Sequence, residues 1–196
     1  MPDHTTIRAY RPADERSWLH CRVLSFLDTA YFDNVLRERP PVVPPGRGLV
    51  AVDPDGAVLA LLDVSVTGSL ATIESVAVRP EHRRRGLATA LLAAWLAEVP
   101  AGVDTLDAWT RDDPGTLDWY RAAGFAESEH FLHVYADLRS HPEEPDRAIG
   151  ARRPGLRPIT LFLSAPLAEA ARLRGEFGRV HVCRRFSRPL TRSVAG

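Results

Sequence analysis

Residues 74–92 read ESVAVRPEHRRRGLATALL, and this stretch decides the fold. It begins as a short strand-like segment that stops at Pro80, continues through three consecutive arginines, and passes Gly86 into a strongly apolar segment. A helix that starts at this point presents unpaired N–H groups and the positive end of its dipole to the preceding loop. We therefore expect the loop to bind a phosphate or diphosphate, which Gly86 allows to approach the backbone closely.

The apolar segment after Gly86 has the period of a helix. Leu87, Leu91 and Trp95 recur on one stripe with few polar residues between them, so a sheet should cover this helix. Other helices are predicted from Asp14 onward, over 114–123 and around 167–177, and strands over 5–11, 48–52, 57–66, 71–78, 105–109, 132–138 and from 180 to near 190. An early hairpin followed by strand–helix–strand crossovers implies an α/β fold with a mixed sheet covered by helices.

Composition excludes several classes of protein. The 196 residues suffice for one domain with a sizeable core, and 45% apolar with 26% charged residues is ordinary for a globular chain. The formal net charge is zero, which provides no long-range field to attract nucleic acid or a membrane. The two cysteines, Cys21 and Cys183, suggest neither a disulfide framework nor a metal site. Without an apolar leader or a run of about 18 apolar residues, we expect a cytoplasmic protein.

Three short motifs together resemble one family. Arg83-x-x-Gly86-x-Ala88 resembles the Q/R-x-x-G-x-G/A pyrophosphate loop of the GNAT (Gcn5-related N-acetyltransferase) superfamily. Residues 76–80 resemble that family's fourth strand, whose backbone pairs with the pantetheine arm of coenzyme A. Residues 119–125, WYRAAGF, are similar to the family's LYxxxGF signature. Each motif alone is weak evidence, but their order and spacing agree.

The resemblance implies a GNAT-like α/β (α+β) fold, which is a mixed, mostly antiparallel twisted sheet flanked by helices. It covers roughly residues 5–138, and the final strand would be the family's closing strand. Residues 1–196 would then form a single acetyltransferase domain. Residues 140–178, a loose loop rich in proline, arginine and acid followed by a helix, would be a helical insert between the last two strands, where typical members have a short turn.

The implied activity is acetyl-CoA-dependent N-acetyl transfer to an amine of a small molecule or protein, by direct attack on the thioester. Acetyl-CoA would be a co-substrate, and no metal is implied. Asp113 stands where many members carry an asparagine, and a carboxylate cannot donate as an amide does. The cofactor-binding residues implied are Val76, Ala77, Val78, Arg83, Arg84, Arg85, Gly86, Leu87, Ala88, Thr89, Asp113 and Tyr120.

Acetyl transfer to an amine requires a base, because an amine with a pKa of roughly 10.4 arrives protonated. Glu74 has the strand parity of Val76 and Val78 and is the candidate base, with Asp107 as an alternative. By resemblance, the N–H of Val78 would stabilise the oxyanion, and Tyr120 would protonate the departing sulfur. Structural alternatives remain: Glu74 is also compatible with a solvated strand residue, and Tyr120 with a packed aromatic.

Other functions and the acceptor stay open at this point. A catalytically idle acyl-CoA-binding module is compatible with the same motifs, whereas zero net charge disfavours nucleic-acid binding through residues 83–85 and 152–153. The partner would be a small-molecule or peptide amine, and a homodimer is compatible with the sequence. Candidate residues for the acceptor pocket are Tyr31, Phe32 and Tyr135, while His133, His181 and Cys183 suggest only filling of the core or surface.

Overall fold

The computed structural model describes residues 5–190 and contains one sheet of eight strands flanked by helices. The elements in chain order are β1 (Thr6–Ala9), η1 (Pro12–Asp14), α1 (Glu15–Phe26), β2 (Arg47–Val52), β3 (Val58–Thr67), β4 (Leu70–Val78), η2 (Pro80–His82), α2 (Leu87–Leu96), β5 (Thr105–Thr110), α3 (Pro114–Ala122), β6 (Ala126–Asp137), α4 (Glu144–Arg147), β7 (Thr160–Ala165), η3 (Leu167–Glu169), α5 (Ala170–Glu176) and β8 (Arg179–Pro189).

The strands lie in the order β1-β2-β3-β4-β5-β8-β6-β7, and every adjacent pair is antiparallel except β4 with β5. Helix α2 makes the crossover that this parallel pair requires. Local chemistry sets the hairpin between β2 and β3: the Asp53 side chain accepts from the N–H of Ala57 at 2.8 Å, and Gly56 adopts φ +84°. The predicted mixed, mostly antiparallel fold is confirmed.

Two cores lie on opposite faces of strands β2–β5, which we call the main sheet. On one face, α2 and α3 pack against β2–β5 around Leu91, Trp95 and Phe186, which are almost completely buried. On the other face, α1 packs against the same strands through Trp18 and Cys21, and we call this face the α1 face. Because both faces of β3 are covered, its sequence is nearly continuously apolar.

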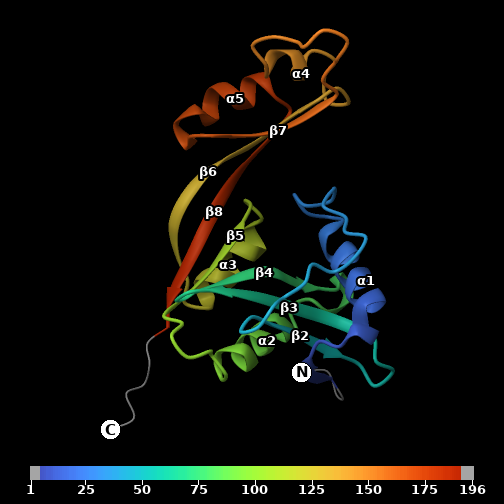
Figure 1. Cartoon of the computed structure of the whole chain (residues 1–196), viewed down its shortest axis with the longest axis vertical. Helices are drawn as coiled ribbons and strands as arrows, with labels where there is room; N and C mark the ends of the chain where they lie inside the picture. The colour runs from blue at the N-terminus through green and yellow to red at the C-terminus, as the bar shows by residue number, and fades with distance from the viewer. Residues whose placement is uncertain (1–4, 191–196) are drawn as a thin grey trace.

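Strands β6 and β8 extend beyond the main sheet as a long ribbon that carries β7, α4 and α5 at its far end (Figure 1). Helix α5 packs against one face of this ribbon through Leu173 and Phe177, which meet Leu132, Val134 and Ala136. The predicted helix around residues 167–177 is therefore present, beginning as the short η3 turn.

The sequence analysis missed parts of this ribbon. Strand β6 begins at Ala126 and not at Leu132, since its first residues are exposed on both faces and show no apolar alternation. The loop predicted over 140–158 contains the short helix α4, and the unassigned residues 160–165 form the edge strand β7. No helix within residues 5–190 is long and apolar enough to cross a membrane.

Candidate active site

One cleft of about 970 Å³ brings together all the catalytic and cofactor-binding residues predicted from the sequence. Its walls come from α1 and the loop after it, the second half of β4, the loop into α2, and α3. The predicted residues that line it are Glu74, Val76, Ala77, Val78, Arg83, Arg84, Arg85, Gly86, Leu87, Ala88, Thr89, Asp113 and Tyr120. Their chemical roles remain predictions.

The loop before α2 has the backbone geometry of an anion-binding site. Arg84 adopts φ +59° and Gly86 adopts φ +78°, so successive N–H groups turn toward one side of the loop. Among residues 5–190, no backbone or side-chain oxygen accepts a hydrogen bond from the N–H of Leu87, Ala88 or Thr89. Such free N–H groups at the start of a helix favour a bound anion.

The three arginines of this loop differ in their contacts. Arg83 donates to the Ser25 carbonyl at 2.7 Å and so ties the loop to the end of α1. Arg84 and Arg85 are exposed and form no ion pair with any residue that the structure describes. Two free cations therefore stand at the opening of the cleft, beside the free N–H groups.

Strands β4 and β5 form a fork at the centre of the cleft. They pair only from Leu70 with Thr105 to Ile73 with Ala108, and they separate beyond that point. The N–H of Arg79 donates to Leu59 on β3 at 2.9 Å. Because amide directions alternate along a strand, the N–H groups of Val76 and Val78 point away from β3, toward the open side of the fork.

Glu74 lies at a β-bulge, which changes the direction of its side chain. Ser75 pairs with Asp63 and Ile73 pairs with Val64, so Glu74 has no partner on β3. Its carboxylate accepts from Ser65 Oγ at 2.5 Å, on the α1 face. Val76 and Val78 pack on the opposite face. The prediction that Glu74 shares a face with these two valines is therefore wrong, although its exposed carboxylate still lines the cleft.

Asp107, the alternative base, is fully engaged. It is 2% exposed, accepts from Thr72 Oγ1 at 2.7 Å and from Arg185 Nε at 2.6 Å, and does not line the cleft. A carboxylate held in this way on both oxygens is a poor proton acceptor for a substrate, so Glu74 is the better candidate.

Tyr120 is both a packed aromatic and a residue of the cleft. Its ring stacks on Phe186 with centroids 5.3 Å apart and meets Trp119 and Phe125 edge-on. Burial raises the pKa of its phenol well above the ordinary value of 10.0, so the hydroxyl stays protonated. That hydroxyl donates to no residue that the structure describes, and it is free to donate to a ligand.

Asp113 caps helix α3. Its Oδ1 accepts from the N–H of Thr116 at 2.8 Å and from the Thr116 hydroxyl at 2.7 Å. This is the ordinary role of an aspartate before Pro114 at a helix start. A contact with the cofactor would therefore fall to Oδ2.

The three candidate acceptor residues divide between two places. Tyr31 lines the cleft, and burial raises its pKa to about 12. Phe32 and Tyr135 lie outside it, and both contact the Arg179 guanidinium, whose carbon is 4.5 Å and 3.8 Å from the two ring centroids. Arg179 also pairs with Asp33, at 2.5 Å.

Sequence reasoning missed three residues of this region. Trp109, 38% exposed, lines the cleft at the fork. Buried Arg22 lines it too and donates to the Asn34 carbonyl at 2.7 Å. Buried Arg111 donates to the Ala30 carbonyl and the Tyr135 hydroxyl. Only Trp109 could have been found from the sequence, because it is a large aromatic residue on the face of its strand that otherwise carries the polar residues Thr105 and Asp107.

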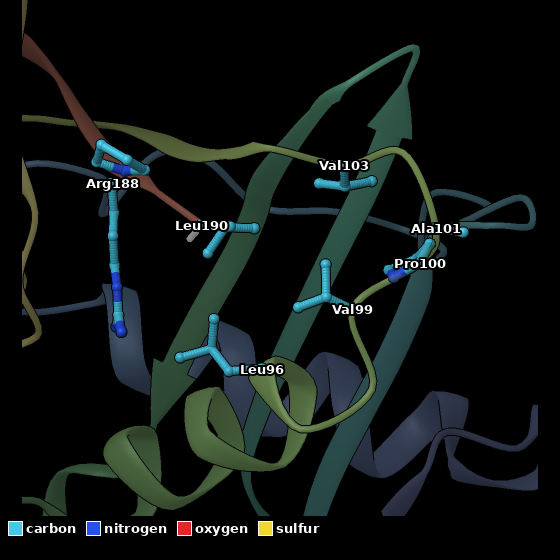
Figure 2. Close-up of a pocket in the computed structure, with 8 residues that line it drawn as sticks. Leu96, Val99, Pro100, Ala101, Val103, Arg188 and Leu190 are labelled. Atoms are coloured by element: carbon cyan, nitrogen blue, oxygen red, sulfur yellow. The ribbon is translucent and has the colours of Figure 1, made fainter. Parts of the chain in front are cut away.

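A second, smaller pocket of about 300 Å³ lies at the opposite end of the main sheet (Figure 2). Leu96, Val99, Val103 and Leu190 point toward one another there, and Arg188 extends past them. Arg188 donates to the Ala123 carbonyl at 2.8 Å and is the one charged residue in the lining. This pocket contains none of the predicted site residues. No cluster of His, Cys, Asp and Glu within residues 5–190 has the arrangement of a metal site.

Comparisons with known proteins agree with this geometry. Residues 44–127 match the family model described as an acetyltransferase (GNAT) domain. No curated protein is similar enough in sequence to match the chain. The fold resembles the ribosomal-protein-S18-alanine N-acetyltransferase of Escherichia coli, at 16% identity and a TM-score of 0.60, with 98% of this chain and 97% of that chain covered.

Two further solved structures have the same fold. An N-acetyltransferase from Staphylococcus aureus Mu50 is 12% identical, with a TM-score of 0.60 and coverage of 96% and 100% of the two chains. A GNAT superfamily phosphinothricin acetyltransferase from Sinorhizobium meliloti, in complex with AcCoA, is 19% identical, with a TM-score of 0.58 and coverage of 98% and 91%. The arrangement of strands and helices is therefore that of the GNAT acetyltransferases. Residues 44–127 match the GNAT acetyltransferase domain, and the chain has the GNAT fold.

Proposed function

We propose that the protein is an acetyl-CoA-dependent N-acetyltransferase that acts on an amine of a small molecule or peptide. The observation that carries the proposal is the set of free N–H groups of Leu87, Ala88 and Thr89, which stand beside two unpaired arginines at the opening of the cleft. The same cleft holds a carboxylate, Glu74, and a protonated phenol, Tyr120. The groups that we propose as the anion site, the base and the acid therefore all line one cleft.

The residues present fit the two ends of coenzyme A. The loop 83–89 would hold the diphosphate through its N–H groups, with Arg84 and Arg85 supplying positive charge. The outward N–H and C=O groups of Val76 and Val78 would bind the amide-containing pantetheine arm, because β5 no longer pairs with β4 at this level. The phenol of Tyr120 would lie near the thioester.

When bound, acetyl-CoA supplies an acetyl group activated as a thioester. Glu74 accepts a proton from the ammonium of the acceptor, through water, and so frees the nitrogen lone pair. The nitrogen–carbon bond forms as the carbon–sulfur bond breaks, and the N–H of Val78 stabilises the charge that develops on the carbonyl oxygen. Tyr120 donates its proton to the sulfur, and the second proton that the nitrogen loses as the amide forms is released to solvent, from which Tyr120 is reprotonated.

We also propose that residues 1–196 form one functional domain, in which residues 140–178 are an insert and not a separate module. Within the described residues, β7 of this insert extends the common sheet by pairing with β6, and α5 packs on the β6–β8 ribbon. The insert therefore supports the ribbon that lies next to the cleft.

The experiment is a free-thiol release assay with acetyl-CoA and a panel of primary amines, run beside calorimetry with coenzyme A. For Glu74→Gln and Tyr120→Phe we expect kcat to fall by about 10²-fold, while the affinity for coenzyme A changes less than about twofold. Tyr10→Phe is the matched control, because Tyr10 packs beneath Arg39 on the α1 face and does not line the cleft.

Full turnover in both variants would remove the catalytic assignments. Binding of coenzyme A without turnover of any amine by the wild type would favour the idle acyl-CoA-binding module instead.

A further inference from the structure

A row of aromatic rings lies along one face of the β6–β8 ribbon. We call Trp109, Phe131, His133, Phe162 and Tyr135 the aromatic row. Successive ring centroids along it are 5.3, 5.0, 4.7 and 4.8 Å apart. The odd-numbered residues of β6 supply three of these rings, while β5 and β7 supply the first ring and the fourth.

The row lies on the face of the ribbon opposite α5, and the loop after α1 meets this face at the Tyr135 end through Arg111 and Arg179. The even-numbered residues of β6 point to the other face, where α5 packs on them. Trp109 is 38% exposed and Phe162 is 57% exposed, and no helix among the described residues covers them. A row of half-buried rings with exposed members such as Trp109 and Phe162 favours a binding surface, because exposing large aromatic rings is costly.

The row starts inside the cleft. Trp109 follows Ala108, the last residue of β5 that pairs with β4, and so it stands at the fork. Ala108 packs in the α2-side core, and the alternation of the strand therefore directs Trp109 to the α1 face, where Glu74 also projects. An amine placed beside Glu74 would have its remaining atoms directed along the row.

The charges around the row are compensated. Arg185, beside Trp109, pairs with Asp107 at 2.6 Å and with Glu129 at 3.8 Å. Arg179, beside Tyr135, pairs with Asp33. Buried Arg111 has no carboxylate partner among the described residues, but its donors are used by the Ala30 carbonyl and Tyr135. A surface of this kind fits an uncharged apolar group and not a polyanion.

His133 adds to the apolar character of the row. Burial, Arg111 and His181 lower the pKa of its imidazole to about 4, so the ring is neutral at physiological pH. It packs edge-on against Phe131 and Phe162 and continues the row as a flat neutral ring.

We propose that the aromatic row binds the body of the acceptor, and that the acceptor is an amine bearing an aromatic or other flat apolar group. This inference rests on the proposed N-acetyltransferase function and deepens it by naming a substrate class. Glu74 receives the amine, Trp109 contacts the atoms next to it, and Phe131 and Phe162 contact the more distant ring.

The test compares 2-phenylethylamine with n-butylamine in the thiol-release assay. We expect the wild type to prefer the aromatic amine by about tenfold in kcat/KM, which corresponds to one favourable aromatic contact. Phe131→Ala and Phe162→Ala should each lower this ratio by about fivefold or more. Phe162 is exposed on an edge strand, so its variant keeps the test valid if Phe131→Ala fails to fold.

Leu156→Ala is the matched control, since Leu156 is 63% exposed, lies in the loop before β7, and belongs neither to the cleft lining nor to the aromatic row. It should leave the ratio unchanged. Turnover of both amines without preference, or a ratio unaffected in both phenylalanine variants, would overturn the inference and leave the proposed function standing. Turnover of neither amine, when another amine of the panel is acetylated, overturns the inference alone, whereas turnover of no amine at all overturns both. A wild-type dimer that Phe162→Ala converts to a monomer in light scattering would assign the row to a second copy and overturn the inference as well.

Discussion

Gly86 adopts a backbone conformation that an L-residue rarely takes, with φ at +78°. A Cβ built there would meet no atom within 4 Å, so the glycine is required by the backbone angle and not by lack of space. This angle turns the chain from the arginine loop into α2 and aims the first N–H groups of the helix at the cleft opening.

Gly86→Ala therefore tests the loop. We expect it to cost about 1 kcal/mol of unfolding free energy and to lower the affinity for coenzyme A by about tenfold, because relief of the strain rotates the N–H groups. Gly102→Ala is the control: its φ is +90°, its surroundings are equally open, and it lies in the loop after α2. In thermal unfolding, Gly102→Ala should lose as much stability as Gly86→Ala. In calorimetry, it should bind coenzyme A with the affinity of the wild type. Equal binding by both variants would contradict the role of Gly86.

His133 provides a prediction about pH. Its pKa is about 4 in the folded chain, compared with the ordinary value of 6.5. Between these values the unfolded chain binds a proton that the folded chain does not, so stability is lost as the pH falls from 6.5 to 4. As the pH falls through this window, the melting temperature of His133→Phe should decrease less than that of the wild type. His20→Gln is the control for an exposed histidine. Parallel melting curves for the wild type and His133→Phe would contradict the shift.

At the scale of elements, local patterns predicted those helices and strands that have one buried face. Helix α2 and strands β2–β5 were predicted because apolar period and turn residues agree there. The bulge at Glu74 was not, since nothing in the sequence marks where β4 shifts its register against β3. The exposed start of β6 and the edge strand β7 could not be predicted either, because neither has a continuous apolar face.

Helix α3 provides a prediction at this scale, because Asp113 serves as its N-cap. We expect Asp113→Ala to cost about 1 kcal/mol of stability and Asp113→Asn to restore most of it, since both caps accept from a backbone N–H. Chemical denaturation measures the two differences. Equal stability of the wild type and Asp113→Ala would show that the cap contributes nothing.

Over the whole molecule, two arginines join the loop after α1, which belongs to the cleft wall, to the C-terminal half of the chain. Arg111 and Arg179 both donate to the Ala30 carbonyl, and Arg179 pairs with Asp33, which lies 146 residues earlier in the chain. The loop after α1 is thereby held against the β6–β8 ribbon. Figure 1 shows these two parts facing each other across the molecule.

Removal of this link should loosen the loop. In Arg111→Met we expect faster hydrogen exchange over residues 27–36, with little change in β3, because the Ala30 carbonyl and Tyr135 lose a buried donor. Arg172→Met is the control, since Arg172 is exposed on α5 and pairs only with Glu169 and Glu176. Unchanged exchange in the loop of Arg111→Met would show that other contacts hold it.

This arrangement explains which half of the site could be predicted. The proposed cofactor half is encoded in one continuous segment, residues 74–89, and in the short motif around Tyr120. The proposed acceptor half is assembled from segments far apart in the chain, so no local pattern in the sequence related Trp109, Arg22 and Arg111 to one another.

The central claim is that the N–H groups of residues 84–89 bind the diphosphate of coenzyme A, and amide NMR tests it most directly. On addition of coenzyme A to the 15N-labelled protein, we expect downfield shifts of the amide protons of Gly86, Leu87 and Ala88, because each gains a charged acceptor. Pantetheine, which lacks the diphosphate, should leave these three signals in place. Saturation with coenzyme A that leaves all the amide signals of residues 84–89 unmoved would contradict the account.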